Sequence, residues 1–127
     1  MIGALAWAMK RVVRDTTLLI APHGWPDFLV FNDFLDQADR VLRKTKLDGV
    51  LQIASFHPQF QFADSEPDAL SNYTNRAPFP TLHLLREDSV ERAVDTAGGD
   101  ADAIVERNLK TLQELGAEGW RALMAKP

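Results

Sequence analysis

The order of three segments constrains the fold of this chain more than any other feature of the sequence. Thr16 to Ala21 and Val50 to Phe56 are short β-prone runs bounded by turn residues, which is typical of buried strands. The segment between them begins near Pro26 and has the period of an amphipathic helix. Its apolar positions are Phe28, Phe31, Phe34 or Leu35, Ala38, and Val41 or Leu42. A strand, a helix and a strand in this order predict a parallel β-α-β crossover.

The remaining segments predict a small mixed domain around that unit. Thr81 to Arg86 is a third β-prone run, and the stretch from His57 to Thr81 has no regular period. Helical patterns occupy three further segments, which are Ile2 to Val13, Ser89 to Ala97, and a stretch from about Asp100 to Gly116. We therefore expect one domain over residues 1–127, of the α/β (α+β) class, with about three strands flanked by helices.

Composition limits the functions that this chain can have. It has 127 residues and no cysteine, which excludes disulfides, thiolate metal sites and a cysteine nucleophile and fits a reducing, cytoplasmic compartment. A net charge of −4 disfavours nucleic-acid binding. The apolar run at the N-terminus is too short to span a bilayer, so we expect no membrane association. The sequence contains no Gly-rich phosphate loop, serine nucleophile elbow or zinc-protease helix motif.

Two histidines and one acid form the first candidate site. His23 and His57 each follow a predicted strand, and Asp27 lies in the first turn of the predicted helix. Because ligands bind beyond the carboxyl ends of parallel strands, these three side chains are predicted to meet in one catalytic pocket. They suit acid–base chemistry or a divalent metal such as zinc, iron or manganese, although no metal or cofactor is identified by their spacing. The alternative is that both histidines hydrogen-bond nearby backbone at the strand ends.

A polar stretch in the long loop forms the second candidate site. Asn72, Tyr73, Asn75 and Arg76 bring amide, phenol and guanidinium groups together, which suits recognition of a carboxylate or phosphate. The alternative is structural: the amides bond the loop backbone, Tyr73 packs, and Arg76 pairs with an acid.

Several segments resemble a known family. The residues that carry the resemblance are Pro22-His23 with Asp27-Phe28, Asn32 to Asp36, Gln52 to Pro58, and Asn72 to Pro80 running into Leu82 to Glu87. The Ser-Phe-His-Pro and Asn-Tyr-Thr-Asn-Arg motifs are similar to those of an uncharacterised bacterial and plant family known as a domain of unknown function. The resemblance runs from Thr16 to about Val94 and implies no activity. It also implies a longer N-terminal part, with a Cys-Pro-Phe segment and a further strand and helix, which this chain lacks.

Three functions remain open from the sequence. We favour binding of a small anionic molecule at the carboxyl edge of the sheet, with the loop arginine as the clamp. The second is a metal-dependent or acid–base enzyme that uses the histidines and Asp27. The third is a homodimer or larger homo-oligomer without a catalytic site, formed through the sheet edges and the aromatic residues of the loop.

Overall fold

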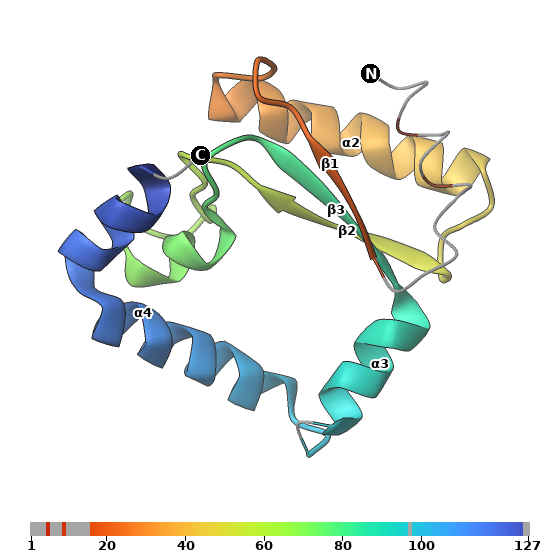
Figure 1. Ribbon diagram of the computed structural model, residues 1–127. Coiled ribbons are helices and arrows are strands. Elements are labelled where there is room, and N and C mark those ends of the chain that lie inside the picture. The colour runs from red at the N-terminus through yellow and green to blue at the C-terminus, as the bar shows by residue number, and fades with distance from the viewer. Residues whose placement is uncertain (1–4, 6–8, 10–15, 97, 126–127) are drawn as a thin grey trace.

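A three-stranded sheet with helices around it forms the fold of this protein in a computed structural model, which describes residues 5, 9, 16–96 and 98–125 (Figure 1). The elements, in chain order, are β1 (Thr16–Ile20), α2 (Phe28–Lys44), β2 (Leu51–Phe56), the 3-10 helix η1 (Leu70–Asn75), β3 (Thr81–Arg86), α3 (Glu87–Thr96) and α4 (Ala101–Ala125). The predicted mixed class and the three strands are confirmed.

The strand order differs from the expectation. The sheet runs β1-β3-β2, and β3 is antiparallel to both of its neighbours. The predicted parallel crossover is therefore wrong, because the third strand inserts between the two strands that flank α2. Since β1 and β2 are both antiparallel to β3, they still point in the same direction. Their carboxyl ends meet at one edge of the sheet, where Thr81 pairs with both Ile20 and Phe56.

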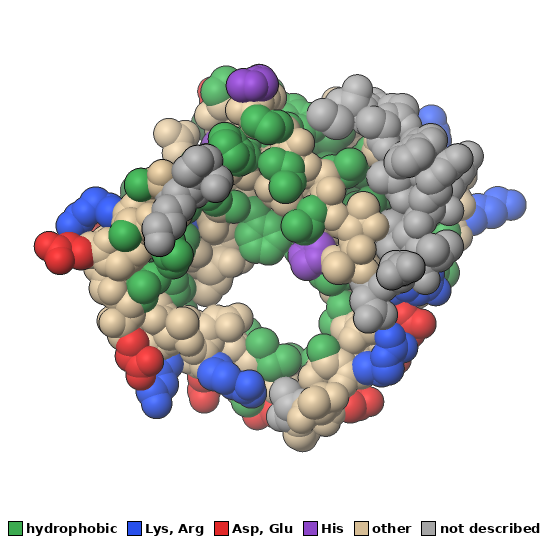
Figure 2. Space-filling view, in the orientation of Figure 1, with side chains coloured by type: hydrophobic (Ala, Val, Ile, Leu, Met, Phe, Trp, Pro, Cys, Tyr) green, Lys and Arg blue, Asp and Glu red, His purple; other side chains and the backbone are tan. Residues whose placement is uncertain are grey.

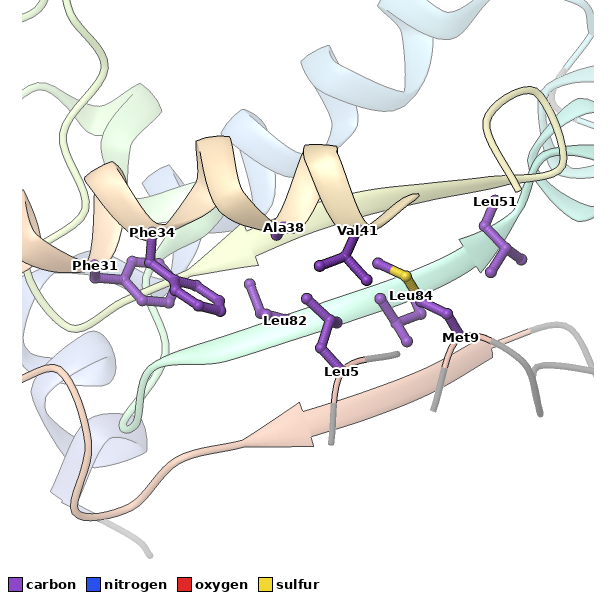
Figure 3. Close-up of a cluster of buried hydrophobic side chains, with 9 residues drawn as sticks. All are labelled: Leu5, Met9, Phe31, Phe34, Ala38, Val41, Leu51, Leu82 and Leu84. Atoms are coloured by element: carbon purple, nitrogen blue, oxygen red, sulfur yellow. The ribbon is translucent and has the colours of Figure 1, made fainter. Parts of the chain in front are cut away.

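Helix α2 covers one face of this sheet. Asp27 caps its N-terminus by accepting a hydrogen bond from the Leu29 N–H at 2.8 Å, and the helix ends at Lys44. Apolar residues that recur every three or four positions are buried against the sheet. Figure 3 shows the resulting core, which contains Leu5, Met9, Phe31, Phe34, Ala38, Val41, Leu51, Leu82 and Leu84. Burying a large aliphatic or aromatic side chain contributes about 1.5–3 kcal/mol, so this layer carries much of the stability.

The predicted N-terminal helix falls largely outside the described residues. Leu5 and Met9 are helical, and their exposed fractions are 0% and 2%. Both side chains join the core beside Leu84 and Val41 (Figure 3). The other apolar residues of this predicted stripe, including Ile2 and Val12, are not described.

The two C-terminal helices stand apart from the sheet. β3 runs directly into α3, which begins at Glu87, two residues before the predicted start at Ser89. α4 follows after a turn at Gly98 and Gly99. Gly116, predicted as a helix stop, has φ 72° and interrupts α4. No described residue of α3 or α4 is buried. Figure 1 shows α3 and α4 as an arm that leaves the end of β3 and returns to η1.

Candidate functional site

The two predicted histidines lie at the same edge of the sheet. His23 follows β1 and His57 follows β2, and both line one small hollow of about 300 Å³. His23 is exposed, whereas His57 is 1% exposed. The shared direction of β1 and β2 therefore brings these residues together even though the strands are not neighbours.

Both ring nitrogens of His57 are already engaged. Nδ1 accepts a hydrogen bond from the Gln59 N–H at 3.0 Å, so Nε2 carries the proton and donates to the Trp25 carbonyl at 2.8 Å. The ring also lies against Phe28 and Phe31, with centroid distances of 5.4 and 5.2 Å. His57 therefore connects the turn between β1 and α2 to the start of the long loop. Neither ring nitrogen has a free lone pair with which to bind a metal.

Asp27 does not complete a pocket with the histidines. Its carboxylate caps α2, and the residue is not part of the lining of the hollow that contains His23 and His57. Across the described residues, no group of three or more His, Asp or Glu is arranged to hold a metal ion. The catalytic assignment of these three residues stays a prediction. In the structure, Asp27 caps α2, and His57 hydrogen-bonds the backbone of Trp25 and Gln59.

The composition of this hollow also bears on anion binding. Its lining includes prolines at positions 22, 26, 58, 78 and 80. Proline has no backbone N–H, and backbone N–H groups are the usual donors to a bound anion. The hollow at the sheet edge therefore offers few donors to a carboxylate or phosphate.

The two loop asparagines organise the loop backbone. Asn72 is 0% exposed, and its Oδ1 accepts from the Phe62 N–H at 2.9 Å while its Nδ2 donates to the Glu66 carbonyl at 2.7 Å. Asn75 donates from Nδ2 to the Ser55 carbonyl at 3.0 Å, which fastens η1 to β2. These amides satisfy backbone groups that would otherwise be buried without partners.

Arg76 and Tyr73 join the loop to α4. The Arg76 guanidinium donates to the Phe60 and Pro67 carbonyls at 3.0 and 2.7 Å and lies 4.3 Å from the centroid of the Tyr73 ring. The Tyr73 ring meets Trp120 of α4 edge-on at 5.1 Å. The four predicted anion-binding residues thus lie in one segment, but the amides of Asn72 and Asn75 and the Arg76 guanidinium donate to backbone carbonyls of the loop and β2. Anion binding by them stays a prediction.

A larger cleft lies on the sheet face opposite α2. Alternation along the strands places Leu18 and Ile20 of β1, His83 and Leu85 of β3, and Phe56 of β2 on this face. Leu18 and Ile20 are each 54% exposed. Figure 2 shows an opening in the molecule with hydrophobic side chains around it, bounded by the sheet and by the arm. We call this space the central cleft.

Two hollows make up the central cleft. The first, of about 600 Å³, lies between Thr16, His83 and Leu85 of the sheet and residues of α3, with Ile104 of α4. The second, of about 370 Å³, lies between Phe56 of β2, residues of η1, and Val105 of α4. These volumes fall in the range of small-molecule sites, about 300–1,000 Å³.

His83 is the titratable group on the floor of this cleft. Its Nε2 is hydrogen-bonded to the Thr16 hydroxyl, and its ring lies 6.1 Å from the Phe56 ring. Partial burial lowers the pKa of His83 below its ordinary value of 6.5, so the ring is neutral at neutral pH. The sequence analysis did not select His83. Thr16, Leu18 and Ile20 alternate on one face of their strand, but the sequence alone does not show whether a helix covers that face.

Comparisons with known proteins give a family and no activity. A family model described as "Protein of unknown function (DUF1415)" matches residues 4–122. No curated protein and no solved structure matches the chain significantly. Among the described residues, no helix is both long and apolar enough to cross a membrane.

Proposed function

We propose that this chain, which belongs to the DUF1415 family of proteins of unknown function, binds a small, mainly apolar molecule in the central cleft. The observation that carries the proposal is the sheet face itself. Leu85 of β3 and Phe56 of β2 line the cleft from the sheet, and Ile104 and Val105 of α4 line it from the opposite side. Unfilled apolar surface on both walls of one cleft favours an apolar occupant.

The shape of the cleft favours a small molecule over a protein surface. The sheet, α3, α4 and η1 surround an opening that passes through the molecule, and each hollow has the volume of a ligand site (Figure 2). A flat surface of a second copy could cover this opening but could not fill it. A ligand of that size gains its affinity from apolar burial, with few polar groups to orient it.

The proposal retains small-molecule binding from the sequence analysis and moves it to another part of the fold. At the carboxyl edge of the sheet, the prolines and the engaged His57 leave an anion few donors. In the central cleft, apolar side chains dominate both walls. Enzymatic chemistry has less support, because His57 and Asp27 are each occupied by backbone hydrogen bonds.

A neutral fluorescent probe tests the proposal. N-phenyl-1-naphthylamine brightens on entering an apolar site, and the wild-type chain is expected to bind it at one saturable site. The variant Ala93→Trp, on the α3 wall of the first hollow, is expected to weaken binding about tenfold by filling the cleft. The matched control Ala122→Trp lies on an exposed part of α4 outside the lining and is expected to bind as the wild type does.

Three results would overturn the proposal. The first is absence of saturable probe binding by the wild type, and the second is binding by both tryptophan variants as tight as that of the wild type. A doubled mass in light scattering together with no probe binding would show that a second copy covers the apolar face instead.

A further inference from the structure

The floor of the central cleft carries a polar pair among apolar neighbours. His83 lies at the centre of β3 and Thr16 at the start of β1, and the Thr16 hydroxyl is hydrogen-bonded to Nε2 of the imidazole. Among the described residues, this hydroxyl is the only hydrogen-bond partner of the ring. Both residues line the first hollow of the cleft. An inference about this pair rests on the proposed function, since it concerns the ligand of the same cleft.

The pair offers one donor and one acceptor in either tautomer. If the Thr16 hydroxyl donates to Nε2, then Nδ1 of His83 carries the ring proton and can donate it. The hydroxyl oxygen keeps lone pairs that can accept a second hydrogen bond. If Nε2 donates to the hydroxyl oxygen, then Nδ1 accepts and the Thr16 O–H donates. The partner that satisfies both groups must itself donate and accept.

The charge of the cleft favours a neutral partner. Burial lowers the pKa of His83, so the imidazole is uncharged at neutral pH. Among the described lining residues of the two hollows, Arg92 is the only charged side chain, and its guanidinium is directed to Asp88 at 3.8 Å and to the Ser89 hydroxyl at 3.1 Å. An ammonium group entering this cleft would meet no acid among its described lining residues, and a carboxylate would have to compete with Asp88 for Arg92, so a charged group gains little for the hydration it loses.

We infer that Thr16 and His83 form the polar recognition point of the central cleft, and that its ligand is a neutral apolar molecule carrying a hydroxyl or primary amide group. The apolar part lies along Leu85, Ile104 and the adjoining hollow, and the polar group meets the Thr16–His83 pair. A ligand that only accepts hydrogen bonds satisfies half of the pair.

A series of eight-carbon probes tests the chemical class. Displacement of N-phenyl-1-naphthylamine is measured with 1-octanol, octanamide, 1-methoxyheptane, octanoate and octylamine at pH 7.5. The alcohol and the amide are expected to bind about fivefold more tightly than the ether, because the ether forfeits one hydrogen bond. Octanoate and octylamine are expected to bind more weakly than the ether.

Three variants connect this preference to the pair. Thr16→Val removes the hydroxyl with little change of shape, and it is expected to abolish the preference for the alcohol over the ether. His83→Leu is expected to do the same while retaining binding of the fluorescent probe. Thr17→Val is the matched control, because Thr17 is the next residue of β1 and points to the α2 face. Urea unfolding of each variant shows that it is folded.

The outcomes separate this inference from the proposed function. Three results would overturn the inference while the proposed function stands. They are probe binding without any preference for the alcohol, a preference for octanoate, and a preference for the alcohol that survives in Thr16→Val. Failure of the wild type to bind the fluorescent probe would overturn both.

Discussion

Replacement of Asn72 by leucine is expected to destabilise the whole chain, although the residue lies in a loop. Its Oδ1 accepts from the Phe62 N–H at 2.9 Å and from the Ser65 hydroxyl at 2.8 Å, and its Nδ2 donates to the Glu66 carbonyl at 2.7 Å. The side chain is 0% exposed, so water cannot replace these contacts without opening the loop. Leucine has a similar size and can form none of them.

The magnitude follows from the partners that lose a hydrogen bond. The Ser65 hydroxyl has a second acceptor, the Phe62 carbonyl at 2.9 Å, so its loss adds little. The Phe62 N–H loses its Asn72 acceptor, which costs about 1 to 3 kcal/mol. The Glu66 carbonyl keeps the hydrogen bond from the Ala69 N–H at 3.0 Å, so losing the Asn72 amide there adds less. We therefore expect a loss of about 2 to 3 kcal/mol in the free energy of unfolding.

Urea unfolding followed by circular dichroism measures this loss. With a denaturant slope near the middle of the usual range, the midpoint is expected to fall by roughly 1 to 1.5 M. Asn32→Leu on the exposed side of α2 is the matched control and should change the free energy by less than about 0.5 kcal/mol. A loss below about 1 kcal/mol for Asn72→Leu would refute the view that this amide holds the loop.

Three further predictions concern other parts of the molecule. His57→Phe is expected to cost about 2 kcal/mol in urea unfolding, because the Trp25 carbonyl and the Gln59 N–H lose their partner, and an unchanged midpoint would contradict this. Burial lowers the pKa of His83 below 6.5, so the unfolded chain binds this proton more tightly; wild-type stability should be complete above about pH 6.5 and fall below it. His83→Leu should flatten that fall, which parallel pH titrations of stability would detect. Trp120→Ala removes the edge-on contact with Tyr73 and should speed hydrogen exchange at residues 117–125 without changing exchange in α2; equal speeding in both helices would oppose it.

Local patterns in the sequence were sufficient to place most elements. The β-prone run from Thr81 to Arg86 matches β3 to the residue, and Phe28 to Lys44 follows the apolar period that α2 buries. These signals are local because each depends on neighbouring side chains and turn residues. The interruption of α4 at Gly116 was predictable for the same reason, since glycine readily adopts a positive φ.

Strand order was not predictable from those patterns. A strand, helix and strand order is compatible with direct parallel pairing and with a third strand inserted between the two, and periodicity distinguishes neither. β3 inserts from a segment more than 20 residues downstream of β2, so the deciding contacts are long-range. The common location of His23 and His57 was predicted from parallel pairing, whereas in the structure it results from two strands that are antiparallel to a shared neighbour.

The roles of the candidate site residues were likewise not predictable from the sequence alone. His57, Asn72 and Arg76 were selected because their side chains are chemically versatile, and the same versatility allows them to satisfy loop carbonyls and N–H groups. Which of these tasks a residue performs depends on its neighbours across the loop. His83 was missed because the open sheet face becomes evident only when the positions of α3 and α4 are known.

The arm formed by α3 and α4 is fastened at both ends. β3 continues into α3 without a loop, and the far part of α4 meets η1 through Trp120 and Tyr73. A molecule in the central cleft is therefore encircled by the chain, as the opening in Figure 2 shows. Its escape requires passage along the opening or release of the Trp120 contact. If release of the Trp120 contact is the faster route, Trp120→Ala would speed association and dissociation alike and change the equilibrium constant little; unchanged rates would show that the molecule passes along the opening.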